Sequence, residues 1–300
     1  MPTEDDVISD AGQALPPELC FAPDLGRQGD DGARRRTRSW AQLCHDLRTL
    51  SDELGAGLEK LTTEDGRATS LCEGWDVRDV VVHLVVGDDL ALRTLQGEDC
   101  FPDPTDDEHI LQSESRARVE RLAQLDLATA IDRFRSGRER LLNQIIELGP
   151  PDAGERVSWA SKPISTFSMI QSRLMETWVH GWDLRHPLGI PMRFDDRAWW
   201  VADIGVRHVP YSLTKAGIDP GPVELSVSLV GLGGGSWTRV LVASASTASP
   251  PTSVRISGPA WAWVVLVSRR WPGRAGAQTA LRVDAGELGR AVVEQARAFA

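Results

Sequence analysis

The sequence lacks any run of about 18 apolar residues, the length that a membrane-spanning helix requires. Its longest apolar runs are Val80–Val86, which His83 interrupts, and Trp261–Val267. The first residues also lack the basic start and apolar core of a secretory signal, because acidic residues and prolines are frequent there. We therefore expect a cytoplasmic protein that has no membrane partner.

Cysteine, lysine and positive charge are also scarce. The four cysteines lie too far apart for the short spacings of zinc-binding motifs, and in a cytoplasmic chain they predict free thiols. Lys and Arg number 33 against 43 Asp and Glu, which gives a formal net charge of −10. A protein that binds nucleic-acid backbones carries basic surface, so this balance argues against nucleic acid as the main partner. The cysteines are Cys20, Cys44, Cys72 and Cys100.

What is present indicates a soluble chain with about two domains, since it has 300 residues of which 41% are hydrophobic. Residues 1–36 combine prolines, glycines and acidic residues without periodicity, which predicts a disordered tail. We expect a helical bundle over 37–190, a connecting helical segment over 191–218 and an α+β domain over 219–300. The scarcity of lysine, with arginine in its place, is typical of a GC-rich bacterial genome.

Four long helical regions are expected in the first domain. Leucines repeat every three or four residues from Leu43 to Leu61, which marks the buried face of an amphipathic helix. Asp76 is placed to cap a second helix that contains His83, with Asp79 three residues later in its first turn. A third region covers about 107–148 with a break near Asp126, and a fourth begins at Ser165 or Thr166. Long helices joined by loops predict a four-helix bundle.

The pattern changes in the last third of the chain. After a helical piece over about 195–215, residues 223–230 and 253–257 alternate between apolar and polar side chains, as half-buried strands do. Trp237–Ala243 and Leu281–Val283 predict two further strands. A helix is expected after Pro259 and another at the C-terminus. This mixture predicts a smaller α+β domain.

The sharpest chemical feature is the pair Glu176 and His180, which lie one helical turn apart on the same face. A carboxylate and an imidazole in this arrangement can bind one divalent ion, and His83 on another bundle helix is the obvious third ligand. Two plainer interpretations stay open at this point. A histidine within an apolar helix is often a satisfied core residue, and a Glu/His pair at this spacing is often a surface pair.

Two motifs then resemble a known family. The segment Leu71-Cys-Glu-Gly-Trp-Asp-Val-Arg-Asp-Val-Val-Val-His83-Leu resembles the start of the metal-binding helix in the DinB-like superfamily. It is closer to the mycothiol-dependent maleylpyruvate isomerase family. Residues 173–184 are similar to that family's Arg-x-x-Glu-x-x-x-His-x-x-Asp motif. Residues 254–270 resemble the sterol-carrier-like C-terminal α+β domain of an actinobacterial subgroup.

The resemblance implies that His83, Glu176 and His180 bind one divalent ion, most often zinc. Three protein ligands leave room for water or substrate, which is the catalytic arrangement of zinc. Asp183 is expected to accept a hydrogen bond from a ligand imidazole, or else to cap the helix. Arg173 is expected to orient Glu176 or to bind an anion, with a surface ion pair as the alternative. Cys72 is either a reactive thiol near a helix N-terminus or, more simply, a buried inert one.

The function that this resemblance implies is a metal-dependent isomerase or S-transferase that uses the thiol mycothiol on a small activated organic substrate. Two alternatives belong to other classes. One is a metal-dependent tailoring enzyme of secondary metabolism, an isomerase, cyclase or hydrolase, that needs no thiol. The other is a metal-bound protein that captures a small ligand without catalysis.

Overall fold

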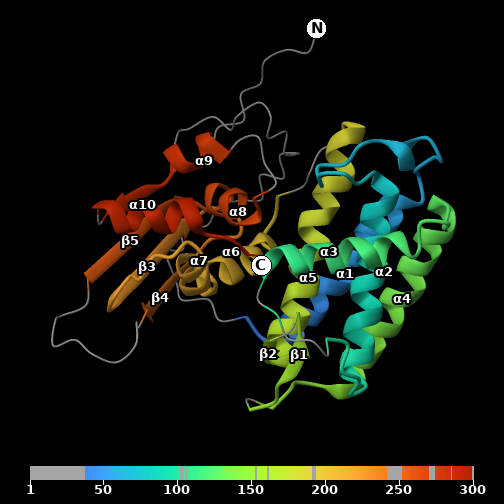
Figure 1. Ribbon diagram of the computed structural model, residues 1–300, viewed down its shortest axis with the longest axis horizontal. Coiled ribbons are helices and arrows are strands. Elements are labelled where there is room, and N and C mark those ends of the chain that lie inside the picture. The colour runs from blue at the N-terminus through green and yellow to red at the C-terminus, as the bar shows by residue number, and fades with distance from the viewer. Residues whose placement is uncertain are drawn as a thin grey trace, which may run out of the picture. The chain divides into compact units, whose positions relative to one another are not determined.

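A computed structural model describes residues 38–101, 105, 107–152, 154–160, 162–190, 194–241, 252–269, 274–284 and 286–298. The tail predicted over 1–36 lies outside these residues. The chain forms two compact units, one of residues 38–190 and one within 191–299. The first is helical and the second contains the main sheet, so the predicted fold class is confirmed (Figure 1).

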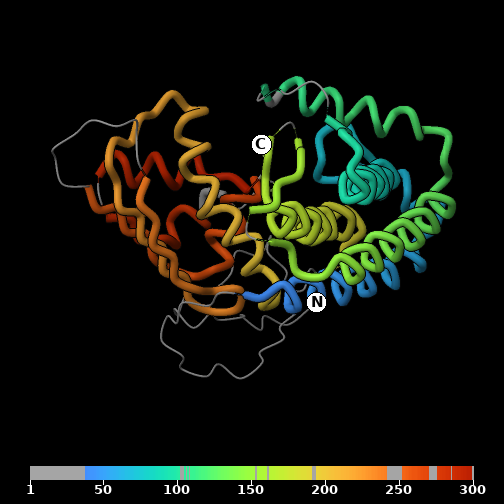
Figure 2. The backbone as a smooth tube through the Cα atoms, turned by 90° about the horizontal axis from the view of Figure 1, so that it is seen from below, coloured from blue at the N-terminus to red at the C-terminus, as the bar shows by residue number. Residues whose placement is uncertain are grey.

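Four long helices and one shorter one build the first unit, and Figures 1 and 2 show α2 and α5 side by side within it. A short antiparallel hairpin, which the sequence reading missed, precedes α5. The elements of this unit are α1 (Trp40–Leu58), η1 (Asp65–Arg67), α2 (Val77–Leu95), α3 (Glu108–Glu120), α4 (Leu127–Leu148), β1 (Val157–Trp159), β2 (Lys162–Ile164), α5 (Thr166–Arg185) and η2 (His186–Leu188).

Side-chain caps set the starts of these helices where the sequence predicts them. Asp76 accepts from the backbone N–H of Asp79, and the Asp79 side chain accepts from the backbone of Asp76, which forms a capping box. Asp126 caps α4, and Ser165 caps α5. Each cap satisfies a backbone donor that the first helical turn leaves without a partner.

The bundle core forms from the apolar faces that the periodicity predicts. Leu43, Leu47, Leu50, Leu54 and Leu58 of α1 are buried. They share the interior with valines of α2 and apolar residues of α4 and α5. Burial of such faces supplies most of the stability of helices of this length.

The second unit is a mixed four-stranded sheet with helices packed against it. The strand order is β4-β3-β5-β6, and β3 pairs antiparallel with β4 but parallel with β5. Helices α8 and α10 contact the sheet, and α6 contacts α8. The elements are α6 (Ala198–Arg207), α7 (Val209–Lys215), β3 (Val223–Val230), β4 (Gly235–Leu241), β5 (Thr252–Pro259), α8 (Ala260–Ser268), α9 (Arg274–Ala280), β6 (Arg282–Asp284) and α10 (Gly286–Gln295).

Alternation along the strands explains which face of the sheet is covered. Val223, Leu225, Val227 and Leu229 of β3 are buried, whereas the residues between them are partly or fully exposed. The helical piece predicted over 195–215 is two helices, because α6 ends at Arg207 and α7 begins at Val209, with His208 between them. Among the described residues, no helix has the length and apolarity needed to cross a membrane.

Candidate metal centre

A tight turn before α2 sets the position of His83. Gly74 adopts a positive φ of 77°, a conformation that glycine reaches without strain, and the chain then enters the Asp76 cap. The Trp75 ring lies 5.1 Å from the His83 ring, centroid to centroid, and so covers one side of the imidazole. His83 is therefore held in the second turn of α2 with its ring packed in place.

Glu176 and His180 project from the same face of α5 toward His83. The Glu176 Oε2 atom lies 2.9 Å from His180 Nε2 and 3.2 Å from His83 Nε2. The donor atoms of all three residues lie within 4.8 Å of one another. The structure thus brings together the three residues that the sequence selected as metal ligands.

Both imidazoles have a partner on the nitrogen that faces away from Glu176. Asp183 Oδ2 lies 2.8 Å from His180 Nδ1, and Ser115 Oγ of α3 lies 3.3 Å from His83 Nδ1. When Nδ1–H donates to an oxygen, the lone pair of a neutral imidazole is on Nε2, which is the atom that a metal would use. Asp183 lies inside α5 and is fully buried, so it occupies the position of a carboxylate that supports a ligand histidine rather than a helix cap.

The distances between the donors suit a divalent ion. A tetrahedral ion with ligands at about 2.0–2.1 Å separates neighbouring donor atoms by roughly 3.3 Å. The observed separations from Glu176 Oε2, 2.9 and 3.2 Å, need only a few tenths of an ångström of opening. Two imidazoles and one carboxylate are also a common set of protein ligands for catalytic zinc, so the residues present fit such an ion.

Cys72 adds a second, buried group of potential ligands on the far side of His180. Its Sγ atom lies 3.0 Å from Asp183 Oδ2 and 3.7 Å from His180 Nδ1. The side chain is buried, with 5% of its surface exposed. Cys44, Cys72 and Cys100 are free thiols as predicted, whereas Cys20 lies outside the described residues.

The electrostatics of the centre follow from burial opposed by hydrogen bonds. Burial alone would lower the pKa of His180, but the contacts with Asp183, Cys72 and Glu176 outweigh it and raise that pKa well above 6.5. Burial would raise the pKa of Glu176, yet hydrogen bonds from His180 and His83 hold it well below 4.5. Burial lowers the pKa of His83, although its hydrogen bond to Glu176 acts in the opposite direction. In the metal-free chain these contacts favour the carboxylate form of Glu176 and the charged form of His180.

Arg173 contacts Asp88 rather than Glu176. It is 2% exposed, and its Nε and Nη2 atoms lie 3.3 and 3.2 Å from Asp88 Oδ1 rather than against Glu176. The guanidinium also reaches the backbone oxygen of Leu84 at 3.5 Å. Arg173 thus forms a buried ion pair, and neither the predicted contact with Glu176 nor the alternative surface ion pair is present among the described residues. Anion binding by Arg173 stays a prediction.

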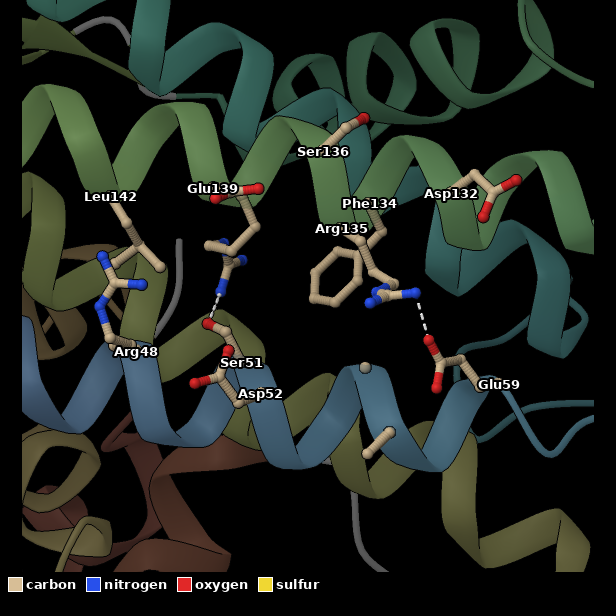
Figure 3. Close-up of a pocket in the computed structure, with 13 residues that line it drawn as sticks. Arg48, Ser51, Asp52, Glu59, Asp132, Phe134, Arg135, Ser136, Glu139 and Leu142 are labelled. Atoms are coloured by element: carbon tan, nitrogen blue, oxygen red, sulfur yellow. Dashed lines mark hydrogen bonds and ion pairs between the residues drawn. The ribbon is translucent and has the colours of Figure 1, made fainter.

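A surface cavity of about 530 Å³ lies elsewhere in this unit (Figure 3). It runs between α1 and α4, with Arg48 and Asp52 on one wall and Asp132, Arg135 and Glu139 on the other. None of the three candidate metal ligands lines it. The cavity is therefore separate from the group of candidate metal ligands.

Sequence reasoning missed three supporting residues, Ser115, Asp88 and Arg138. Ser115 follows no motif, and only the packing of α3 against α2 brings it to His83. A signal existed for Arg138, because it lies four residues after Phe134 on the buried face of α4. A charged residue on an apolar face predicts a buried partner, which here is Asp88.

Comparison with known proteins agrees with these features. Residues 47–185 match the family model of the mycothiol maleylpyruvate isomerase N-terminal domain. Two uncharacterized proteins of Mycobacterium tuberculosis, MT0041 and Rv0036c, are each 28% identical over 233 residues, which is 75% of this chain and 84% of theirs.

The fold also has solved counterparts. A crystal structure of the mycothiol-dependent maleylpyruvate isomerase covers 83% of this chain and 95% of its own, with a TM-score of 0.57 and 16% identity. The structure of a histidine-to-alanine mutant of a mycothiol-dependent maleylpyruvate isomerase gives a TM-score of 0.56 at the same identity. At this identity the structural likeness shows the fold alone. The match to the mycothiol maleylpyruvate isomerase N-terminal domain covers residues 47–185, which lie within the helical unit.

Proposed function

We propose that this chain is a divalent-metal-dependent enzyme, with zinc as the expected metal and His83, Glu176 and His180 as its ligands. We further propose that it uses mycothiol to isomerise, or to transfer the thiol to, a small activated organic substrate. The convergence of the His83 and His180 Nε2 atoms on Glu176 Oε2 carries the proposal. The thiol is inferred from the family model that residues 47–185 match.

A bound divalent ion at this centre would supply the positive charge that lowers the pKa of a thiol or water in its open position. The chain itself contributes one negative charge through Glu176 and two neutral imidazoles, so the charge of a divalent ion is only partly neutralised. Asp183 and Ser115 hold the two rings in the orientation that presents Nε2. The Trp75 ring packs against the His83 ring, with the centroids 5.1 Å apart.

The experiment is a mycothiol titration of the cobalt-substituted protein, followed by absorption spectroscopy. The proposal expects a thiolate-to-cobalt charge-transfer band. The band should grow as mycothiol is added and saturate at one equivalent of mycothiol per bound cobalt. A Cys72→Ser variant removes the chain's own nearby thiol, so a band that persists in it comes from the added cofactor.

The outcomes separate the three classes of function. A protein that binds no stoichiometric cobalt would overturn the proposal as a whole. Stoichiometric cobalt without a mycothiol-dependent band would overturn the thiol and favour a thiol-independent metal enzyme. A cobalt spectrum that changes neither with mycothiol nor with ionisation of a bound water would indicate a closed coordination shell. That result would favour a ligand-binding protein instead.

A further inference from the structure

A buried ion-pair network lies beside the candidate metal centre and ties the four long helices together. Arg138 of α4 makes a two-point contact with Asp88 of α2, with Nε–Oδ2 at 2.8 Å and Nη2–Oδ1 at 2.9 Å. Arg173 of α5 binds the same carboxylate. Arg138 also donates to Ser51 of α1 at 2.6 Å and to Thr177 of α5 at 3.0 Å. We call these five residues the Asp88 network.

The network is almost completely shielded from water. The side chains of Asp88, Arg138 and Arg173 are 1, 2 and 3% exposed. Removing such charges from water is costly unless partners satisfy them, so their retention in a helical core requires well-formed contacts. The Asp88 network makes those contacts. It therefore favours one set of relative positions for the four helices that carry its residues.

The Asp88 network and the metal donors are successive polar contacts along one pair of antiparallel helices. His83 of α2 meets Glu176 of α5, and Asp88, five residues later, meets Arg173, three residues earlier. With a rise of 1.5 Å per residue, the two contacts lie about 4.5–7.5 Å apart along the helices. Thr177 also connects them, because it neighbours Glu176, donates to the backbone oxygen of Arg173 at 2.7 Å and accepts from Arg138.

Metal coordination needs a tighter helix register than apolar packing supplies. Ligand distances hold to about ±0.2 Å, whereas a slide of α5 along α2 by one residue would move the donors by roughly 1.5 Å. Apolar side chains between α2 and α5 can repack after a small slide of one helix along the other. The same slide would break the hydrogen bonds between the Asp88 carboxylate and the two guanidinium groups that bind it. The Asp88 network therefore opposes the motion that would separate His83 from Glu176 and His180.

Gly87 makes the contact of Arg173 possible. A Cβ atom at this position would lie 2.5–2.6 Å from Nη2, Cζ and Nη1 of Arg173, which is closer than real Cβ contacts. The guanidinium thus lies directly against the backbone of α2, in space that any other residue would fill. A single methyl group at Gly87 is accordingly a specific way to displace Arg173 from Asp88.

We propose that the Asp88 network is a positioning device that holds α5 against α2 in the register that the metal donors require. Asp88, Arg138 and Arg173 are positioning residues in this proposal and touch neither metal nor substrate. The inference rests on the proposed metal centre, and its test is designed so that the two can fail separately.

The experiment measures cobalt affinity and the cobalt d–d spectrum of the full chain for Gly87→Ala and for Gly137→Ala as the matched control. Gly137 lies in the middle of α4, and the nearest atom to an added Cβ there is Arg140 Nη2 at 4.0 Å. Both changes raise intrinsic helix propensity, so the Gly137→Ala variant controls for the effect of propensity alone. We expect Gly87→Ala to weaken cobalt binding at least about tenfold, the lower range for residues that support metal ligands. We also expect its d–d spectrum to change, with Gly137→Ala within about twofold of wild type.

A second variant, Arg173→Lys, tests the same contact without an added Cβ. Lysine keeps the positive charge but has no fork of donors for the Asp88 carboxylate. We expect a weakened cobalt affinity and a changed spectrum in a chain that keeps its helical circular dichroism. Wild-type affinity and spectrum in Gly87→Ala and Arg173→Lys, with only a lower Tm, would overturn the inference and leave the metal centre standing. Failure of the wild-type chain to bind cobalt would overturn the metal centre itself.

Discussion

Replacing Asp183 with asparagine removes the negative charge beside His180 but keeps the side-chain volume and an acceptor oxygen. The Asp183 carboxylate is fully buried, and its Oδ2 atom lies 2.8 Å from His180 Nδ1. It fixes the ring and makes the opposite nitrogen a better donor to a metal. We expect Asp183→Asn to weaken Zn²⁺ binding by about 10–100-fold, which corresponds to about 1.4–2.8 kcal/mol.

The assay is competition for Zn²⁺ against a chromogenic chelator over a series of pH values. Asp183 also raises the pKa of His180, so at lower pH the variant faces less competition from protons. The comparison is therefore made on the high-pH plateau, where His180 is neutral in both proteins. Asp46→Asn is the control, because Asp46 is a buried carboxylate of α1 that pairs with Arg38 and Gln42, away from the metal donors. Equal plateau affinities for wild type and a folded Asp183→Asn would refute the reasoning.

Three further outcomes follow from the same contacts. Zn²⁺ affinity is expected to fall as the pH drops below the raised pKa of His180, because the metal must then displace a proton from the imidazole. Zn²⁺ affinity measured over a series of pH values tests this expectation, and an affinity that does not change with pH would contradict it. Above about pH 6.5 the metal-free protein is expected to lose stability as the pH rises through that pKa, since the folded state holds the His180 proton more tightly than the unfolded state; urea unfolding with a chelator present tests the sign. Asp76→Ala removes the cap of α2 and is expected to lower the free energy of unfolding by about 0.5–2 kcal/mol in urea melts. An unchanged urea midpoint would show that the capping box is dispensable.

Most of the fold could be predicted because local signals and long-range packing agree. The leucines of α1, the Asp76 cap and the break at Asp126 are each visible within a few residues. The strand β3 alternates as expected over Val223–Val230. The hairpin of β1 and β2 was missed because its strands are three residues long and contain Pro163, so they carry almost no periodic signal.

The sequence could predict the three candidate ligands and the contact of Asp183 with His180, but not the other supporting residues. Glu176 and His180 follow a helical spacing, and His83 lies in an apolar stretch of another bundle helix. The family resemblance then supports all three as candidate ligands. Ser115 comes from a helix that only tertiary packing places against His83. Arg173 lies in the same motif as Glu176, yet its partner Asp88 lies 85 residues away in the sequence. No local pattern specifies such a pair.

The metal content of the full chain tests the central claim most directly. The protein is loaded with Zn²⁺, freed of excess metal by gel filtration and analysed by inductively coupled plasma mass spectrometry, in parallel with His83→Ala. We predict one equivalent of zinc per wild-type chain and a large loss of zinc from a folded His83→Ala. Substoichiometric zinc in wild type, or full retention of zinc by His83→Ala, would contradict the assignment of His83, Glu176 and His180 as the metal ligands.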